Sequence, residues 1–189
     1  MTFLTSSELN SIGFKHVGRN VKIGSFVSIN RPEEISIGNN SRIDDFSALS
    51  GNVIIGNNVH IAVQCSLVAG SEALVMKDFS GLAFGCKLFT SSDDYSGKSL
   101  TNPTIPGRYK SVTNGQITIG RHVIVGTNSV VFPGVEIAEG CAIGALTLVT
   151  KSTIPWGIYV GSPARRIKER NRDLLVLEEE YLNDLGGEF

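Results

Sequence analysis

Apolar residues recur every six positions along most of the chain. From Ile37 the sequence reads IGNNSR, IDDFSA, LSGNVI, IGNNVH, IAVQCS and LVAGSE without a break, and the pattern returns at Met76 and at Ile119. The first position of every hexad is Ile, Leu, Val or Met, and the fifth is always Val, Ser, Cys or Thr. Since neither an amphipathic helix nor an ordinary strand has this period, the hexads define a structural repeat.

Each hexad predicts a short strand followed by a tight turn, in which Gly or Asn-Asn supplies backbone conformations with positive φ. The aliphatic first residue and the small fifth residue both point inward, so the interior is narrow. Three hexads make one triangular coil, and equivalent residues of successive coils stack at a strand spacing of about 4.8 Å. The pattern therefore predicts an all-β solenoid, a parallel β-helix built from hexapeptide repeats.

The repeat has one small irregularity and three notable residues. The step from Leu67 to Met76 is longer than one hexad, which predicts a bulge at one corner. Cys65, Cys86 and Cys141 all occupy the inward fifth position, where we expect reduced packing residues rather than a disulfide framework or a metal site. In this register Cys65 and Cys86 stack on each other.

The two ends of the chain predict caps, because each coil of a solenoid is stabilised only by its neighbours. Residues 6–14 predict a short helix that starts at Ser6 or Ser7. Residues 161–189 form a tail with an apolar helical stripe, which we expect to pack on the coils of its own chain or of a neighbour. The predicted organisation is an N-terminal cap over 1–20, the β-helix over 21–160 and this tail; the stripe comprises Leu174, Leu177, Tyr181 and Leu185.

Composition narrows the function classes. The chain has 189 residues, of which 41% are hydrophobic and 19% charged, and its formal net charge is −1. This balance fits one folded domain and argues against a nucleic-acid partner, which would require a basic face. No segment approaches the ~18 apolar residues of a membrane span, and the first residues lack the features of a secretory signal. We therefore expect a cytoplasmic protein without membrane insertion.

The hexads are interrupted by a loop at 89–117, which is long for a compact domain and for that reason predicts a functional segment. It carries paired acids, Asp93 and Asp94, and a set of side chains suited to hydrogen bonding and stacking. We expect the loop to face a substrate, with Tyr95, Arg108 and Tyr109 as acceptor-binding residues.

The hexads, this loop and the ending TIPWGIYVGSPARRI resemble the hexapeptide-repeat acyltransferases, in particular the sugar O-acetyltransferase branch that includes galactoside and maltose acetyltransferases. The resemblance extends from Phe3 to the C-terminal helix. It implies that the β-helix is left-handed and assembles as a homotrimer, with acetyl-CoA lying in the cleft between two prisms. It also implies a role in bacterial surface-polysaccharide (O-antigen or capsule) biosynthesis.

The same resemblance implies residues for acetyl-CoA. Contacts to the pantetheine fall on Gly126 and Thr127 of VGTNSV and on Gly144 and Ala145 of IGALTL. The nucleotide phosphates are matched to three cations, which suit a polyanionic group; these are Lys151, Arg165 and Arg166.

The catalytic base is less clear, because the family's loop histidine is replaced here by Asp93. Such a base needs a pKa near the operating pH, and an exposed Asp meets that need only if burial or pairing with Asp94 raises its pKa. His60 lies at a corner near the loop, where either acid could reach and orient it. His122 is expected to be an exposed turn residue. The candidates are therefore His60 and the Asp93–Asp94 pair, with no metal.

The function predicted from these residues is transfer of an acetyl group from acetyl-CoA to a hydroxyl of a carbohydrate or nucleotide-sugar acceptor. Transfer to the amino group of a nucleotide-linked amino sugar is an alternative that needs less help from a base. Two other classes stay open: a non-catalytic β-helix scaffold, and a zinc carbonic anhydrase, which would need three converging histidines. Only His16, His60 and His122 are available for such a site.

Overall fold

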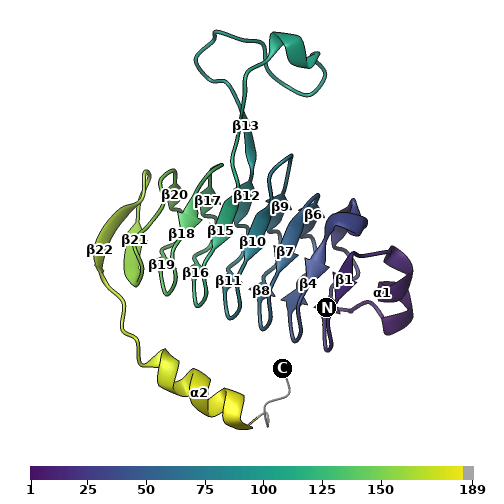
Figure 1. The fold of residues 1–189 in the computed structure, drawn as a ribbon, viewed down its shortest axis with the longest axis vertical. Helices are drawn as coiled ribbons and strands as arrows, with labels where there is room; N and C mark the ends of the chain where they lie inside the picture. The colour runs from purple at the N-terminus through teal and green to yellow at the C-terminus, as the bar shows by residue number, and fades with distance from the viewer. Residues whose placement is uncertain (185–189) are drawn as a thin grey trace.

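The computed structural model describes residues 1–184 and shows a left-handed parallel β-helix whose coils stack along one axis (Figure 1). Three sheets form the sides of the prism. The first sheet contains β1 (His16–Val17), β4 (Ser36–Ile37), β7 (Val53–Ile55), β10 (Leu74–Met76), β15 (Ile117–Ile119) and β18 (Glu136–Ile137). The third sheet contains β3 (Ser28–Asn30), β6 (Ala48–Ser50), β9 (Ser66–Val68), β12 (Lys87–Phe89), β17 (Val130–Val131) and β20 (Leu148–Val149).

The second sheet is the longest and continues to the C-terminal end of the stack. It contains β2 (Lys22–Ile23), β5 (Arg42–Ile43), β8 (His60–Ile61), β11 (Gly81–Leu82), β16 (Ile124–Val125), β19 (Ala142–Ile143), β21 (Gly157–Val160) and β22 (Arg165–Glu169). All its neighbouring strands are parallel except the last pair, because β22 turns back antiparallel on β21.

The register confirms the hexads as the repeating unit. Ile37 pairs with Ile55, Ile55 pairs with Met76, and Met76 pairs with Ile119 although the loop lies between the last two. The extra residues after Leu67 form a bulge between β9 and β10, as predicted. Insertions at corners therefore leave the stacking of the coils unchanged.

The small fifth residues have a hydrogen-bonding role as well as a packing role. The Ser47 hydroxyl donates to the carbonyl of Ala62 at 3.0 Å and accepts from the backbone N–H of Cys65 at 3.2 Å, so it links successive coils. Ser41 and Ser129 make equivalent contacts inside the prism. A large side chain would displace these links and would not fit beside the fully buried aliphatic column.

The three cysteines are free and completely buried. Cys65 and Cys86 lie in adjacent coils, and their hydrogen bond, together with burial, raises the pKa of the Cys86 thiol. Because all three thiols are inaccessible to reagent, we expect none to react with Ellman's reagent in the native protein and all three to react in denaturant. Titration of one fast thiol in the native state would contradict this packing.

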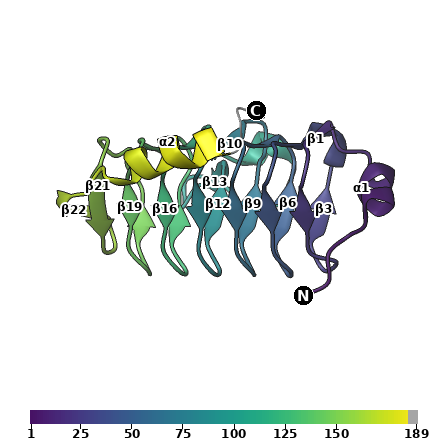
Figure 2. The same ribbon diagram turned by 90° about the horizontal axis from the view of Figure 1, so that it is seen from below.

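Helices cap or flank the stack. α1 (Ser6–Ile12) begins after Thr5, whose side chain and that of Glu8 form a capping box, so the N-cap is Thr5 rather than Ser6 or Ser7. A 3-10 turn, η1 (Pro32–Glu34), follows β3. α2 (Leu174–Asp184) runs back along the prism (Figure 2); Leu185 of the predicted stripe lies outside the described residues. Within residues 1–184, no helix has the length and apolar character needed to cross a membrane.

The loop forms an arm that stands away from the prism on a narrow stalk (Figure 1). Its base is the antiparallel pair β13 (Ser91–Asp93) and β14 (Val112–Asn114), and its tip contains a 3-10 turn, η2 (Gly107–Tyr109). The arm leaves the prism after β12, on the side opposite α2.

Candidate active site

His60, Asp44 and Arg42 form a polar cluster on the second sheet. Arg42 pairs with His60 across β5 and β8, and Asp44 follows Arg42 by two residues, which brings all three together. The His60 Nε2 lies 3.0 Å from Asp44 Oδ2, and Arg42 Nε donates to Asp44 Oδ1 at 2.6 Å. Asp44 is buried, whereas half of the His60 side chain is exposed.

This geometry fixes the tautomer of the neutral His60 imidazole. Burial alone would raise the pKa of Asp44, but the hydrogen bonds and charges of Arg42 and His60 outweigh it and lower that pKa below its usual value. The ionised carboxylate accepts hydrogen bonds only, so His60 Nε2 carries the proton. The Nδ1 of neutral His60 then has a free lone pair, which is the arrangement of a general base.

The acids of the arm do not reach His60 within one chain. Asp93 Oδ2 accepts from the Asn102 N–H at 3.0 Å, and Asp94 accepts from Ser96 and Ser99. Those bonds, chiefly from Ser96, lower the pKa of the exposed Asp94 rather than raise it. The expected pairing of His60 with these acids is therefore wrong for a single subunit, because the arm leaves from the opposite side of the prism (Figure 1).

The other arm residues are displayed to solvent. Tyr95 is 89% exposed, and Arg108 stacks over the ring of Tyr109 at 4.8 Å. The arm makes its contacts largely with itself, as in the bond from the Leu100 N–H to the Tyr109 carbonyl. It therefore presents apolar and polar groups with no packing partner in the chain described here.

The residues matched to acyl-CoA gather at the corner between the second and third sheets. Gly126 donates its N–H to Ile143, and Leu146 donates to Thr127, so the two matched motifs lie in consecutive coils. Packing between coils also requires glycine at position 126, because a Cβ there would lie 2.5 Å from the backbone nitrogen of Ala145. Lys151, Arg165 and Arg166 follow at the C-terminal end of the stack, where β22 is exposed throughout.

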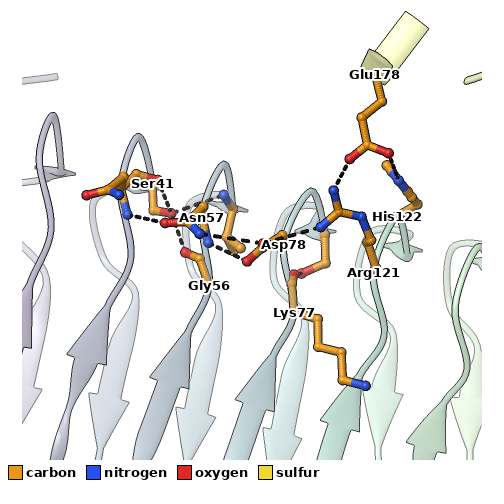
Figure 3. A network of polar contacts seen from close by, with 11 residues as sticks. Ser41, Gly56, Asn57, Lys77, Asp78, Arg121, His122 and Glu178 are labelled. Atoms are coloured by element: carbon orange, nitrogen blue, oxygen red, sulfur yellow. Dashed lines mark hydrogen bonds and ion pairs between the residues drawn. The ribbon is translucent and has the colours of Figure 1, made fainter. Parts of the chain in front are cut away.

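His122 is buried, which corrects the expectation of an exposed turn residue. It stacks on Phe79, and its Nε2 lies 2.9 Å from Glu178 of α2, which also pairs with Arg121 (Figure 3). Arg121 in turn bonds to Asp78, whose other oxygen accepts from the Asn57 N–H. The sequence predicted a C-terminal helix that packs on the coils, but it did not show that Glu178 of this helix covers the turn of His122.

A groove of about 620 Å³ lies between α2 and the second sheet. Its walls combine sheet residues with one face of the helix. Beside it is a smaller pocket of about 250 Å³ lined by Asn40, Arg42, Asn58, Val59 and His60. His60 and Asn58 line both, so His60 lies where the two cavities meet. Within residues 1–184, no three His, Cys, Asp or Glu side chains are placed to hold a metal ion.

Comparison with known proteins settles the family. Residues 34–67 match the family described as bacterial transferase hexapeptide (six repeats). A dTDP-4-amino-4,6-dideoxy-D-glucose acyltransferase of Escherichia coli is 40% identical over 96% of this chain and 95% of its own length. The chain belongs to the hexapeptide-repeat acyltransferases. AntD, an N-acyltransferase from Bacillus cereus solved with dTDP and 3-hydroxybutyryl-CoA, is 45% identical with a TM-score of 0.96, covering 97% of this chain and 98% of AntD.

A more distant member shares only the fold. The maltose O-acetyltransferase of Clostridium difficile 630 is 19% identical with a TM-score of 0.57, and the match covers 88% of this chain and 75% of that one.

One residue of the candidate site was not predicted from the sequence of this chain: Asp44, the partner of His60. The signal was available, because residues 42, 44 and 60 meet on one sheet once coils are stacked in register.

Proposed function

We propose that the protein transfers an acyl group from acyl-CoA to the amino group of a nucleotide-linked amino sugar, with a dTDP-4-amino-4,6-dideoxy sugar as the acceptor. The observation that carries this proposal is the likeness, over nearly the full length of both chains, to the Escherichia coli acyltransferase and to AntD. This favours an amino acceptor over the hydroxyl acceptor expected from the sequence.

In the proposed reaction the sugar amine attacks the thioester carbonyl. A C–N bond forms, the C–S bond breaks, the amine gives up a proton, and the thiolate of CoA leaves and is protonated. His60 Nδ1 accepts the proton of the amine, and the pair Nε2–H and Asp44 stabilises the resulting imidazolium. The buried thiols play no covalent part.

The remaining roles follow the positions of the side chains. Acyl-CoA lies along the corner of Gly126, Thr127, Gly144 and Ala145, with its phosphates towards the cations of the C-terminal end, and reaches His60 across the second sheet. Gly126 follows β16 of the same sheet, two residues beyond Ile124 in the groove. The acceptor approaches His60 from the cavities that this residue lines.

A homotrimer completes this site. The arm and His60 lie on different sides of one prism, yet Asp93, Asp94 and Tyr95 are the polar and aromatic groups best presented for an acceptor. In a ring of three copies the arm of one subunit covers the second sheet of the next, and its exposed Leu100 and Tyr109 gain a packing surface.

The test is thiol release from acetyl-CoA and 3-hydroxybutyryl-CoA with three acceptors: dTDP-4-amino-4,6-dideoxyglucose, its 4-hydroxy counterpart dTDP-6-deoxyglucose, and maltose. We expect turnover with the amino sugar only, and a mass increase equal to one acyl group on the product. Turnover with the 4-hydroxy sugar or maltose, but not with the amine, would replace N-acylation by O-acylation. Lack of turnover and of acyl-CoA binding would favour a scaffold.

A further inference from the structure

The groove beneath α2 is formed without a ligand, because the helix is fastened to the prism at two points. Glu178 bonds His122 at 2.9 Å and pairs with Arg121 (Figure 3). Before the helix begins, the guanidinium of the half-buried Arg170 donates to the carbonyls of His122 and Gly140 at 2.7 and 3.1 Å. The groove is therefore a fixed feature of the described chain and is large enough for a nucleoside.

The walls of the groove are apolar and aromatic. Phe79 lies on the sheet side and Tyr181 on the helix side, with their rings edge to face at 6.1 Å, and His122 stacks on Phe79 at 5.4 Å. Leu174, Leu177 and Ile124 supply the remaining apolar surface. Because these rings contact one another, a planar ligand ring would pack against the aromatic cluster and the aliphatic side chains rather than between the rings.

One buried hydrogen-bond donor in the groove has no acceptor among the described residues. The Nδ2 of Asn58 is buried and has no hydrogen-bond partner, while its Oδ1 accepts from the Tyr181 hydroxyl at 3.3 Å. A buried amide donor without a partner costs free energy, so a ligand that offers an acceptor at this point gains from it. The groove therefore favours a flat ring with a carbonyl oxygen on its edge over a plain acyl chain.

The position of the groove indicates which part of a substrate carries that ring. Its lining includes His60, and across His60 lies the smaller pocket with the half-exposed cation Arg42. The residues assigned to acyl-CoA lie at the other edge of the second sheet. We propose that the groove binds the pyrimidine base of the nucleotide-linked acceptor and that Asn58 Nδ2 donates to a carbonyl of the base. This inference rests on the proposed function.

The experiment measures binding of dTDP and, separately, of CoA to the full-length protein by titration calorimetry. Asn58→Asp keeps the side-chain shape and the acceptor for Tyr181 but removes the Nδ2 donor, so we expect dTDP to bind about tenfold more weakly and CoA to bind as before. Asn20→Asp is the control for the added charge, since Asn20 has the same positive-φ conformation but does not line the groove; its Nδ2 donates to Asn40 of the smaller pocket at 3.0 Å.

A second pair of variants tests the groove without touching the polar network. Leu177→Trp fills the groove from the helix side, and Val176→Trp places the same ring on an exposed neighbour outside the lining. We expect dTDP affinity to fall at least about tenfold only in the first. Unchanged dTDP binding in both Asn58→Asp and Leu177→Trp, or weakening of CoA instead, overturns the inference while leaving the proposed function intact. Failure of the unmodified protein to bind dTDP overturns both.

Discussion

Replacing Asp44 by Asn is expected to lower kcat/KM for acyl transfer by at least about 100-fold while the protein stays folded, because general-base catalysis contributes on this scale. With Arg42 donating to its oxygen, the new amide turns its NH₂ towards His60. The Nε2 of His60 must then accept, which moves the ring proton to Nδ1 and removes the lone pair that receives the proton of the amine.

The measurement is steady-state kinetics combined with ¹⁵N NMR of His60, which distinguishes the two tautomers. Asp45→Asn is the matched control: Asp45 is buried in the same turn, but its Oδ1 accepts from the Phe26 N–H, a bond that an Asn oxygen preserves. We expect near-normal activity in the control. Full activity of Asp44→Asn, or a loss of equal size in Asp45→Asn, would remove His60 and Asp44 from the mechanism.

The same variant changes the response of stability to pH. Because the folded protein lowers the pKa of Asp44, ionised Asp44 stabilises the fold above the usual carboxyl pKa, near pH 4, and this contribution is lost as pH falls through the lowered value. The variant lacks this titration. Its unfolding free energy should therefore fall less steeply than that of the unmodified protein below about pH 4.

Removing the arm is expected to lower kcat/KM for acyl transfer by more than about 100-fold. The melting temperature is expected to stay close to that of the intact protein. Asp93 and Val112 face each other at the end of the antiparallel pair, so residues 94–111 can be replaced by Asn-Gly, the sequence preferred in a two-residue hairpin turn. The coil beneath stays closed because Met76 pairs directly with Ile119. Loss of folding would mean that the arm supports the prism.

Co-expression sharpens this prediction. A chain without the arm and a His60→Ala chain are each expected to be inactive. If a site combines the arm of one copy with His60 of the next, randomly mixed trimers regain about a quarter of the unmodified sites. Mixed trimers with no activity would place each complete site within one chain.

Much of the fold could be predicted from the sequence because the repeat states the same local rule many times. Ile37, Ile55 and Met76 are buried in register because each begins a hexad, and the fifth positions are small because their side chains point into the narrow interior. The step after Leu67 could be predicted for the same reason. A periodic pattern predicts stacking without knowledge of distant contacts.

The site depended on contacts that the period does not specify. Asp44 and His60 belong to different hexads, and their pairing requires the stacking of two coils together with the direction of each side chain. His122 looked like an exposed turn residue because its cover, Glu178 of α2, lies far along the chain. In the sequence Asn58 looks like any other asparagine at a corner of the repeat. Only the structure shows that it lines the groove and accepts a hydrogen bond from Tyr181.

The closed ends of the prism have a consequence for solubility. A stack of parallel strands leaves unpaired backbone groups at each end, and these could template the addition of further molecules into a fibre. Here Phe3 bridges antiparallel to Gly24 beside α1 at one end, and at the other β22 reverses direction with a run of charged residues. Within residues 1–184, neither end of the second sheet therefore presents a strand that a second copy could continue in parallel, which disfavours end-to-end growth along this sheet.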